Sequence, residues 1–66
     1  MTNNHMFTPL WDTDDVAAFL KVPAKTVREW RHKEEGPRYS RLGKHVRYLA
    51  SDVMEWVRNQ SQLDAA

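Results

Sequence analysis

The sequence contains no cysteine among its 66 residues. Disulfide bonds and thiolate zinc sites, which stabilise many very small domains, are therefore excluded. Glycine is also scarce: Gly36 and Gly43 stand seven residues apart, so the sequence has no glycine-rich loop to cradle a phosphate. The longest apolar run covers residues 16–20, far below the roughly 20 residues that cross a bilayer. We therefore expect a soluble, cytoplasmic protein with no membrane partner.

A chain of this length forms one domain at most. With 41% hydrophobic residues it can bury a modest core, but it cannot also enclose a deep substrate cavity. Its size therefore favours a small binding module that folds by packing alone or with help from a partner.

The charges are unevenly distributed, although the formal net charge is only +1. Nine of the ten Lys and Arg residues lie between residues 21 and 48, where they face three glutamates. The flanking segments carry the other six acids and one base, Arg58. A basic middle between two acidic flanks indicates a surface that faces a polyanion.

The spacing of apolar residues predicts two helices joined by a tight turn. Thr13 is the expected N-cap of a first helix over about residues 14–20, with acidic residues in its first turn. Pro23 then marks the turn, and a second helix follows from residue 24 to about residue 33. This helix is apolar on one side and mostly cationic on the other. Gly36 is suited to a left-handed cap at its end.

Two short runs after the second helix predict a β-hairpin, residues 38–42 and 45–49 around a turn that contains Gly43. Its exposed face or tip is expected to carry Arg41, Lys44, His45 and Arg47, while Val46 and Tyr48 face the core. A third helix is expected to begin at a cap on Ser51 or Asp52 and to fade by Gln60.

The predicted fold class is α+β, mostly α: a small winged helix-turn-helix with a two-stranded hairpin wing and a third helix. The expected boundaries are a flexible arm at residues 1–9, a winged helix-turn-helix domain at 10–59 and a disordered tail at 60–66. The three tryptophans belong to the core rather than to a stacking surface, because Trp30 and Trp56 each lie on the apolar face of a helix.

No pattern in the sequence supports catalysis or metal binding. The three histidines lack the spacing of metal ligands, and no serine lies in the context of a nucleophile elbow. The paired carboxylates at residues 14–15 and 34–35 are explained by helix capping and by solvation. We therefore expect no enzyme activity, no catalytic or metal-binding residues and no cofactor.

Binding of double-stranded DNA is the function that the pattern favours, because the second helix of a helix-turn-helix enters the major groove and a basic hairpin can act as a wing. Arg28 and Arg31 suit guanine edges or phosphates, and Lys25 suits a phosphate. Glu29 can accept a hydrogen bond from the amino group of cytosine. The alternative from another class is a protein-interaction module or antitoxin-like inhibitor whose basic face docks an acidic protein.

The segment from Leu10 to Val57 resembles the excisionase-type helix-turn-helix domains related to the MerR winged-helix group. The matching motifs are TDDVAAFL at 13–20, the Val22, Thr26, Val27 and Trp30 pattern, GPRY at 36–39, RLGKHVRY at 41–48 and DVMEWV at 52–57. The chain departs from the family at Pro23 and Ala24, where a serine cap is common. A side-chain cap and one hydroxyl that could bind phosphate are therefore missing.

The resemblance implies a phage or prophage excisionase, also called a recombination directionality factor. Such proteins place the second helix in the major groove and the wing in the adjacent minor groove of attachment-site DNA. They bend this DNA, often as cooperative arrays, and direct a partner integrase toward excision. The implied major-groove contacts are Lys25, Thr26, Arg28 and Glu29, with Arg31 and His32 nearer the backbone, and the implied wing contacts are Arg41, Lys44, His45 and Arg47.

A small transcriptional regulator of the same fold is the alternative that the motifs leave open. The lack of an effector domain and of a long dimerisation helix favours the excisionase, which would act on the nucleoid in a bacterial host. The acidic first helix of one copy, through Asp14 and Asp15, is a candidate to face the basic wing of a neighbouring copy on DNA.

Overall fold

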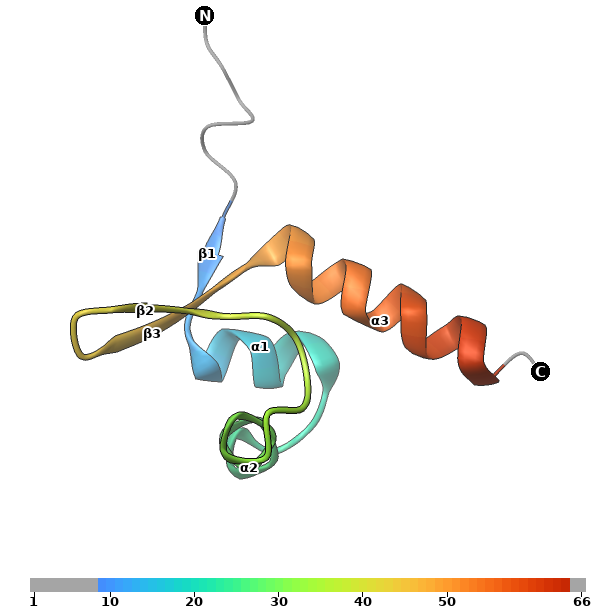
Figure 1. Ribbon diagram of the computed structural model, residues 1–66, viewed down its shortest axis with the longest axis horizontal. Helices are drawn as coiled ribbons and strands as arrows, with labels where there is room; N and C mark the ends of the chain where they lie inside the picture. The colour runs from blue at the N-terminus through green and yellow to red at the C-terminus, as the bar shows by residue number, and fades with distance from the viewer. Residues whose placement is uncertain (1–8, 65–66) are drawn as a thin grey trace, which may run out of the picture.

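The computed structural model describes residues 9–64, in which two short helices and a longer one surround a small antiparallel sheet (Figure 1). The elements are β1 (Leu10–Trp11), α1 (Thr13–Leu20), α2 (Ala24–His32), β2 (Ser40–Leu42), β3 (His45–Leu49) and α3 (Ala50–Asp64). The predicted fold class is confirmed: α1, a turn and α2 are followed by a hairpin and a third helix. The expected arm lies outside the described residues, except for Pro9.

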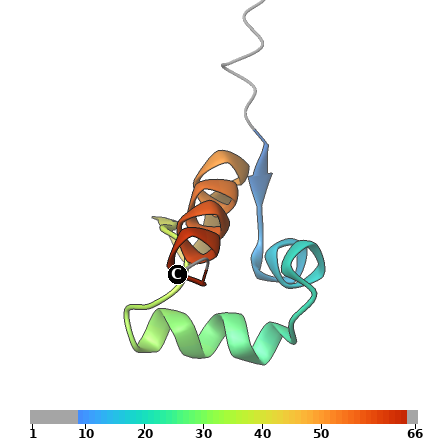
Figure 2. The same ribbon diagram turned by 90° about the vertical axis from the view of Figure 1, so that its right-hand side faces the viewer.

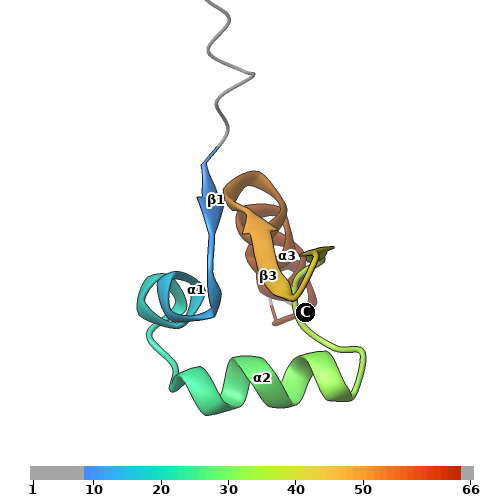
Figure 3. The ribbon, with the colours of Figure 1, turned by 90° about the vertical axis from the view of Figure 1, so that its left-hand side faces the viewer.

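The two helices of the helix-turn-helix cross each other, since Figure 1 views α2 end-on whereas Figure 3 views α1 end-on. The turn between them contains Lys21, whose left-handed backbone (φ 60°) ends α1, and the Val22 N–H donates to the Ala17 carbonyl at 3.0 Å. Pro23 then precedes α2 in an extended conformation without a side-chain cap, as the sequence predicts. From its start near α1, α2 extends toward α3 (Figure 2).

The N-terminus of α1 is held by a capping box, but the predicted cap on Thr13 is wrong. Asp12 is the N-cap: its Oδ1 accepts from the Asp15 N–H at 2.8 Å, and Asp15 Oδ2 accepts from the Asp12 N–H at 3.1 Å. Each carboxylate thus satisfies one of the backbone donors that a helix start leaves free. Thr13 is the first helical residue, and its hydroxyl is used elsewhere.

The end of α2 also differs from the prediction, because Gly36 does not form the cap. Glu34 takes the left-handed conformation (φ 59°), its N–H donates to the Arg31 carbonyl at 3.1 Å, and the Glu35 N–H donates to the Trp30 carbonyl at 2.7 Å. This pair of hydrogen bonds forms a Schellman motif. Gly36 (φ 82°) instead lets the following loop pass against Trp30, because a Cβ there would lie 2.9 Å from the Trp30 ring.

The sheet contains one strand more than the sequence predicts. The hairpin of β2 and β3 is closed by the two residues Gly43 and Lys44, with Gly43 at φ 65°. In addition, β1 pairs antiparallel with β3, so that the strand order is β1-β3-β2. A two-residue strand has no periodicity to reveal it, and its position depends entirely on the presence of β3.

The third helix begins earlier and ends later than the sequence predicts. It follows β3 directly at Ala50, so neither Ser51 nor Asp52 is its cap, and the Ala50 N–H donates to the Pro9 carbonyl at 3.0 Å. It continues past Gln60 to Asp64, so the expected tail begins inside the helix. The division into arm, domain and tail stays a prediction.

Among the helices of the described chain, none combines the length and apolarity that a membrane crossing requires.

The core lies where α1, α2, α3 and β3 meet. Its buried members are Val16, Ala17, Val27, Tyr48 and Val53. The tryptophans are half-buried around this centre, and the rings of Trp30 and Trp56 lie 5.1 Å apart. Tyr48 faces the core as predicted, whereas Phe19 is 47% exposed. Phe19 packs its ring against that of Trp11, at 4.8 Å between centroids.

A polar link, which we call the Arg31 clasp, joins three of these elements. Arg31 Nη1 donates to Thr13 Oγ1 at 3.0 Å and to the Tyr48 hydroxyl at 3.1 Å. The guanidinium also lies over the ring of Tyr39, at 5.9 Å from its centroid. Because Tyr48 is 1% exposed, its hydroxyl would lose a hydrogen bond on folding without this partner. Arg31 therefore fixes α2 against α1 and β3.

Replacing Gly36 tests its close contact with Trp30. We expect Gly36→Ala to lower the free energy of unfolding by about 2 kcal/mol, since it adds a clash with a packed ring to the cost of a left-handed backbone. Gly43→Ala is the matched control: it shares a positive φ but has open space around it, so it should cost about 1 kcal/mol. Urea denaturation followed by tryptophan fluorescence measures both, and equal losses would contradict the close contact.

The Arg31 clasp predicts a stability effect that is unusual for a surface arginine. We expect Arg31→Ala to lower the free energy of unfolding by about 2 kcal/mol, because it removes two hydrogen bonds to a charged donor and leaves the Tyr48 hydroxyl unpaired. Arg28→Ala on the exposed side of the same helix should stay within about 0.5 kcal/mol of the parent. Thermal denaturation of the two variants should differ; equal melting temperatures would show that the clasp does not stabilise the fold.

Candidate nucleic-acid interface

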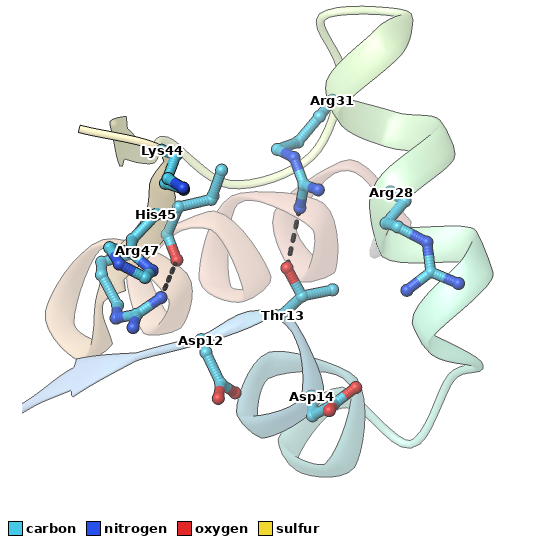
Figure 4. A pocket seen from close by; sticks show the side chains of 9 residues that line it. Asp12, Thr13, Asp14, Arg28, Arg31, Lys44, His45 and Arg47 are labelled. Carbon is cyan, nitrogen blue, oxygen red and sulfur yellow. Dashed lines mark hydrogen bonds between the residues drawn. The ribbon is translucent and has the colours of Figure 1, made fainter. Parts of the chain in front are cut away.

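An open groove of about 310 Å³, which we call the cationic groove, lies between α2 and the β2–β3 hairpin. Figure 4 shows its three sides. Arg28 and Arg31 come from α2, and residues 44–47 come from the turn and β3 of the hairpin. The third side is the start of α1, residues 12–14. Four Arg and Lys side chains therefore converge with two Asp side chains in a hollow that is open to solvent.

The outer side of α2 carries the polar stripe that the sequence predicts. Its exposed members are Lys25, Arg28, Glu29 and His32. Val27 on the opposite side is fully buried, which orients the helix so that the stripe faces outward. Thr26 is partly buried on the flank. Figure 3 shows α2 along an outer edge of the molecule, in agreement with the exposure of these four side chains.

The two strands of the hairpin place its cations on different faces. Residues directly opposite each other in an antiparallel pair point to the same face. The register pairs Ser40 with Arg47, Leu42 with His45 and Arg41 with Val46. His45 and Arg47 therefore share one face, whereas Arg41, which was expected beside them, lies on the other.

Lys44 and Arg47 reach the cationic groove from different parts of the hairpin. Lys44 occupies the turn between the strands. Arg47 lies on β3, where its Nη1 donates to the Val46 carbonyl at 2.8 Å (Figure 4). This bond holds the guanidinium against the hairpin backbone and reduces the entropy that a contact with an anion would cost.

The structure brings together half of the residues that the sequence singles out for DNA contact. The members that line the cationic groove are Arg28, Arg31, Lys44, His45 and Arg47. The other members lie outside it: Lys25, Thr26, Glu29 and His32 on α2 and Arg41 on the hairpin. Arg31 departs most from the free DNA contact that the sequence suggests, because it is half-buried and its guanidinium already donates to Thr13 and Tyr48 within the clasp. The role of all ten in DNA contact stays a prediction.

The acidic side of the groove was not predicted from the sequence. Asp12 and Asp14 line the hollow beside Thr13, because the Arg31 clasp draws the start of α1 against α2. The capping-box pattern of Asp12 and Asp15 could have identified the helix start, but no local signal places it near the hairpin. Asp14 therefore lines the same groove as the hairpin cations of its own molecule, and its contact with a neighbouring copy stays a prediction.

The groove has the chemistry of an anion-binding surface. Its four Arg and Lys side chains come from two separate elements and outnumber the two Asp side chains of α1 and its cap, which leaves an excess of positive charge in the groove. Within residues 9–64, no three His, Cys, Asp or Glu residues gather in a way that could hold a metal ion. Such a surface binds a polyanion through long-range attraction and bidentate arginine contacts.

Comparisons with known proteins identify the family. The helix-turn-helix domain family matches residues 12–61, which cover α1, α2, the hairpin and most of α3. A search of the curated proteins found no relative that matches this chain. The family match agrees with the observed order of α1, a turn and α2. The chain therefore belongs to the helix-turn-helix domain family, whose members bind double-stranded DNA.

Proposed function

We propose that this protein is an excisionase: a non-enzymatic protein that binds and bends attachment-site DNA and directs a partner integrase toward excision. The observation that carries the proposal is the cationic groove between α2 and the hairpin. A family that includes excisionase-like DNA-binding proteins supports it, as does the resemblance of the motifs from Leu10 to Val57. The site of action would be the nucleoid in the cytoplasm of a bacterial host.

The binding mode follows from the separation of two cationic elements. In a duplex, a sugar-phosphate backbone separates the major groove from the adjacent minor groove. If the outer stripe of α2 enters the major groove and the hairpin enters the minor groove, that backbone has to pass between them. The cationic groove occupies this position, with Arg28 and Arg31 on one side and Lys44 and Arg47 on the other.

Within this mode the residues of α2 have different tasks. Arg28 and Glu29 project from the exposed side, where a guanidinium can bind guanine and a carboxylate can accept from cytosine. Lys25 lies one turn before Glu29 and suits a phosphate at the groove edge. Arg31 is held by the clasp, so it supplies a fixed positive charge to the backbone rather than a base contact.

The architectural part of the proposal requires several copies on DNA. Bending a binding site costs on the order of a few kcal/mol, which additional interactions between the protein and the bent DNA have to offset. Copies that bind neighbouring sites cooperatively would share this cost and present a bent substrate to the integrase. A small regulator of the same family is the alternative; it needs the same groove but no integrase.

Salt-dependent binding tests the DNA-contacting surface. We expect affinity for duplex DNA to fall steeply between 50 and about 200 mM salt, because the contacts release counterions. Arg28→Ala should weaken binding, and Arg47→Ala should weaken it broadly across sequences, since a cation at the groove edge contributes mostly phosphate attraction. Arg58→Ala is the matched control on the exposed side of α3, outside the cationic groove.

These titrations distinguish the candidate classes. No measurable affinity for any duplex would end the DNA-binding proposal and favour a basic face that docks an acidic protein. A loss in Arg47→Ala confined to one sequence would contradict its assignment to the backbone.

A recombination assay in vitro tests the excisionase role. We expect the yield of excised product from a substrate with paired attachment sites to rise when the protein is added to the integrase, and Arg28→Ala to abolish the rise. Equal yields of excised product with and without the protein would contradict the excisionase proposal. A change in transcription from a nearby promoter, without a change in excision, would support the regulator instead.

A further inference from the structure

Leu42 is an exposed leucine at the tip of a cationic hairpin. It is 49% exposed and directly precedes the turn of Gly43 and Lys44. The other large apolar side chains that are exposed among residues 9–60 have different settings. Leu10 and Leu49 lie opposite each other across β1 and β3, and Phe19 packs on an aromatic ring. Met54 lies on α3, and none of residues 50–60 of this helix lines the cationic groove. Leu42 differs from these side chains in its position, at the tip of a hairpin that carries cations.

The register shows which way Leu42 points. Leu42 is paired with His45, so both side chains lie on the same face of the hairpin. Arg47, two residues further along β3, shares this face, and both His45 and Arg47 line the cationic groove. Arg41 lies on the opposite face. The tip thus presents one apolar side chain on the same face of the hairpin as His45 and Arg47, next to Lys44 in the turn.

We propose that Leu42 is an apolar wedge that enters a base step in the minor groove and kinks the duplex. This inference rests on the proposed DNA-binding mode and names the residue that would cause the bend. A leucine gains little at an exposed hairpin tip in water, but between unstacked bases it becomes buried. Lys44 in the turn and Arg47 further along β3 can hold the flanking phosphates, so that the tip is pressed into the groove.

Two leucine variants test the wedge in the full-length chain. The DNA probe is a duplex selected for binding from a random pool, with donor and acceptor fluorophores at its ends. We expect Leu42→Ala to change affinity by no more than about tenfold, because the lost burial and the avoided cost of unstacking partly cancel. Energy transfer between the ends should fall to nearly the value of free DNA. Leu42→Met, which keeps an apolar side chain, should retain most of the bend.

Leu49→Ala is the matched control. Leu49 is 38% exposed and shares the face of His45 and Arg47 on β3, as Leu42 does, but it lies at the base of the hairpin rather than at its tip. It should leave both affinity and energy transfer unchanged. A second readout is 2-aminopurine placed at successive steps of the site: its fluorescence should rise at one step with the parent chain and with Leu49→Ala, but not with Leu42→Ala.

The outcomes separate this inference from the proposed function. Binding without bending by the parent chain would overturn the wedge while leaving DNA binding intact. Full bending of the duplex by Leu42→Ala would also overturn the wedge. So would a loss of bending in Leu49→Ala as large as the loss in Leu42→Ala. Failure of the parent chain to bind any duplex would overturn the proposed function itself, and the wedge with it. Circular dichroism of each variant establishes that the loss of bending is not a loss of fold.

Discussion

The guanidinium of Arg31 sets the geometry on which the rest of the molecule depends. It reaches from α2 to a hydroxyl at the start of α1 and to the buried hydroxyl of Tyr48 on β3. In a chain without disulfides and with five side chains at the centre of its core, apolar packing alone fixes few orientations. The clasp joins α2 to β3 of the hairpin by a direct hydrogen bond, and together with the packing of Val27 and Tyr48 in the core it sets the width of the cationic groove between them.

The fold was predictable where the signal is local. Apolar periodicity, Pro23 and the alternation of His45, Val46, Arg47 and Tyr48 identified α1, α2 and the hairpin. A feature that arises from contacts distant in sequence was not, because β1 exists only as a partner of β3. The end of α2 was also missed, although it is local: Glu34 rather than a glycine closes it. Caps were mislocated because several neighbouring residues, such as Asp12 and Thr13, are each competent to cap a helix.

The candidate site divides in the same way. The exposed stripe on α2 follows from helical periodicity, and the structure has each of its four side chains exposed. The strand register, which periodicity does not give, places Arg41 on the opposite face of the hairpin from His45 and Arg47. The acidic wall from α1 and the outward position of Leu42 also require tertiary information. A sequence can therefore name the charged elements of such a surface, but its shape comes from how they are packed.

The central claim is that α2 and the hairpin contact DNA together, as two sides of one surface. Mapping amide chemical shifts by nuclear magnetic resonance, as a selected duplex is added to the labelled chain, tests it most directly. We predict that the largest changes fall together on the exposed residues of α2 and on residues 42–47, with the exposed side of α3 unaffected. Changes centred on α3, or on α2 without the hairpin, would contradict it.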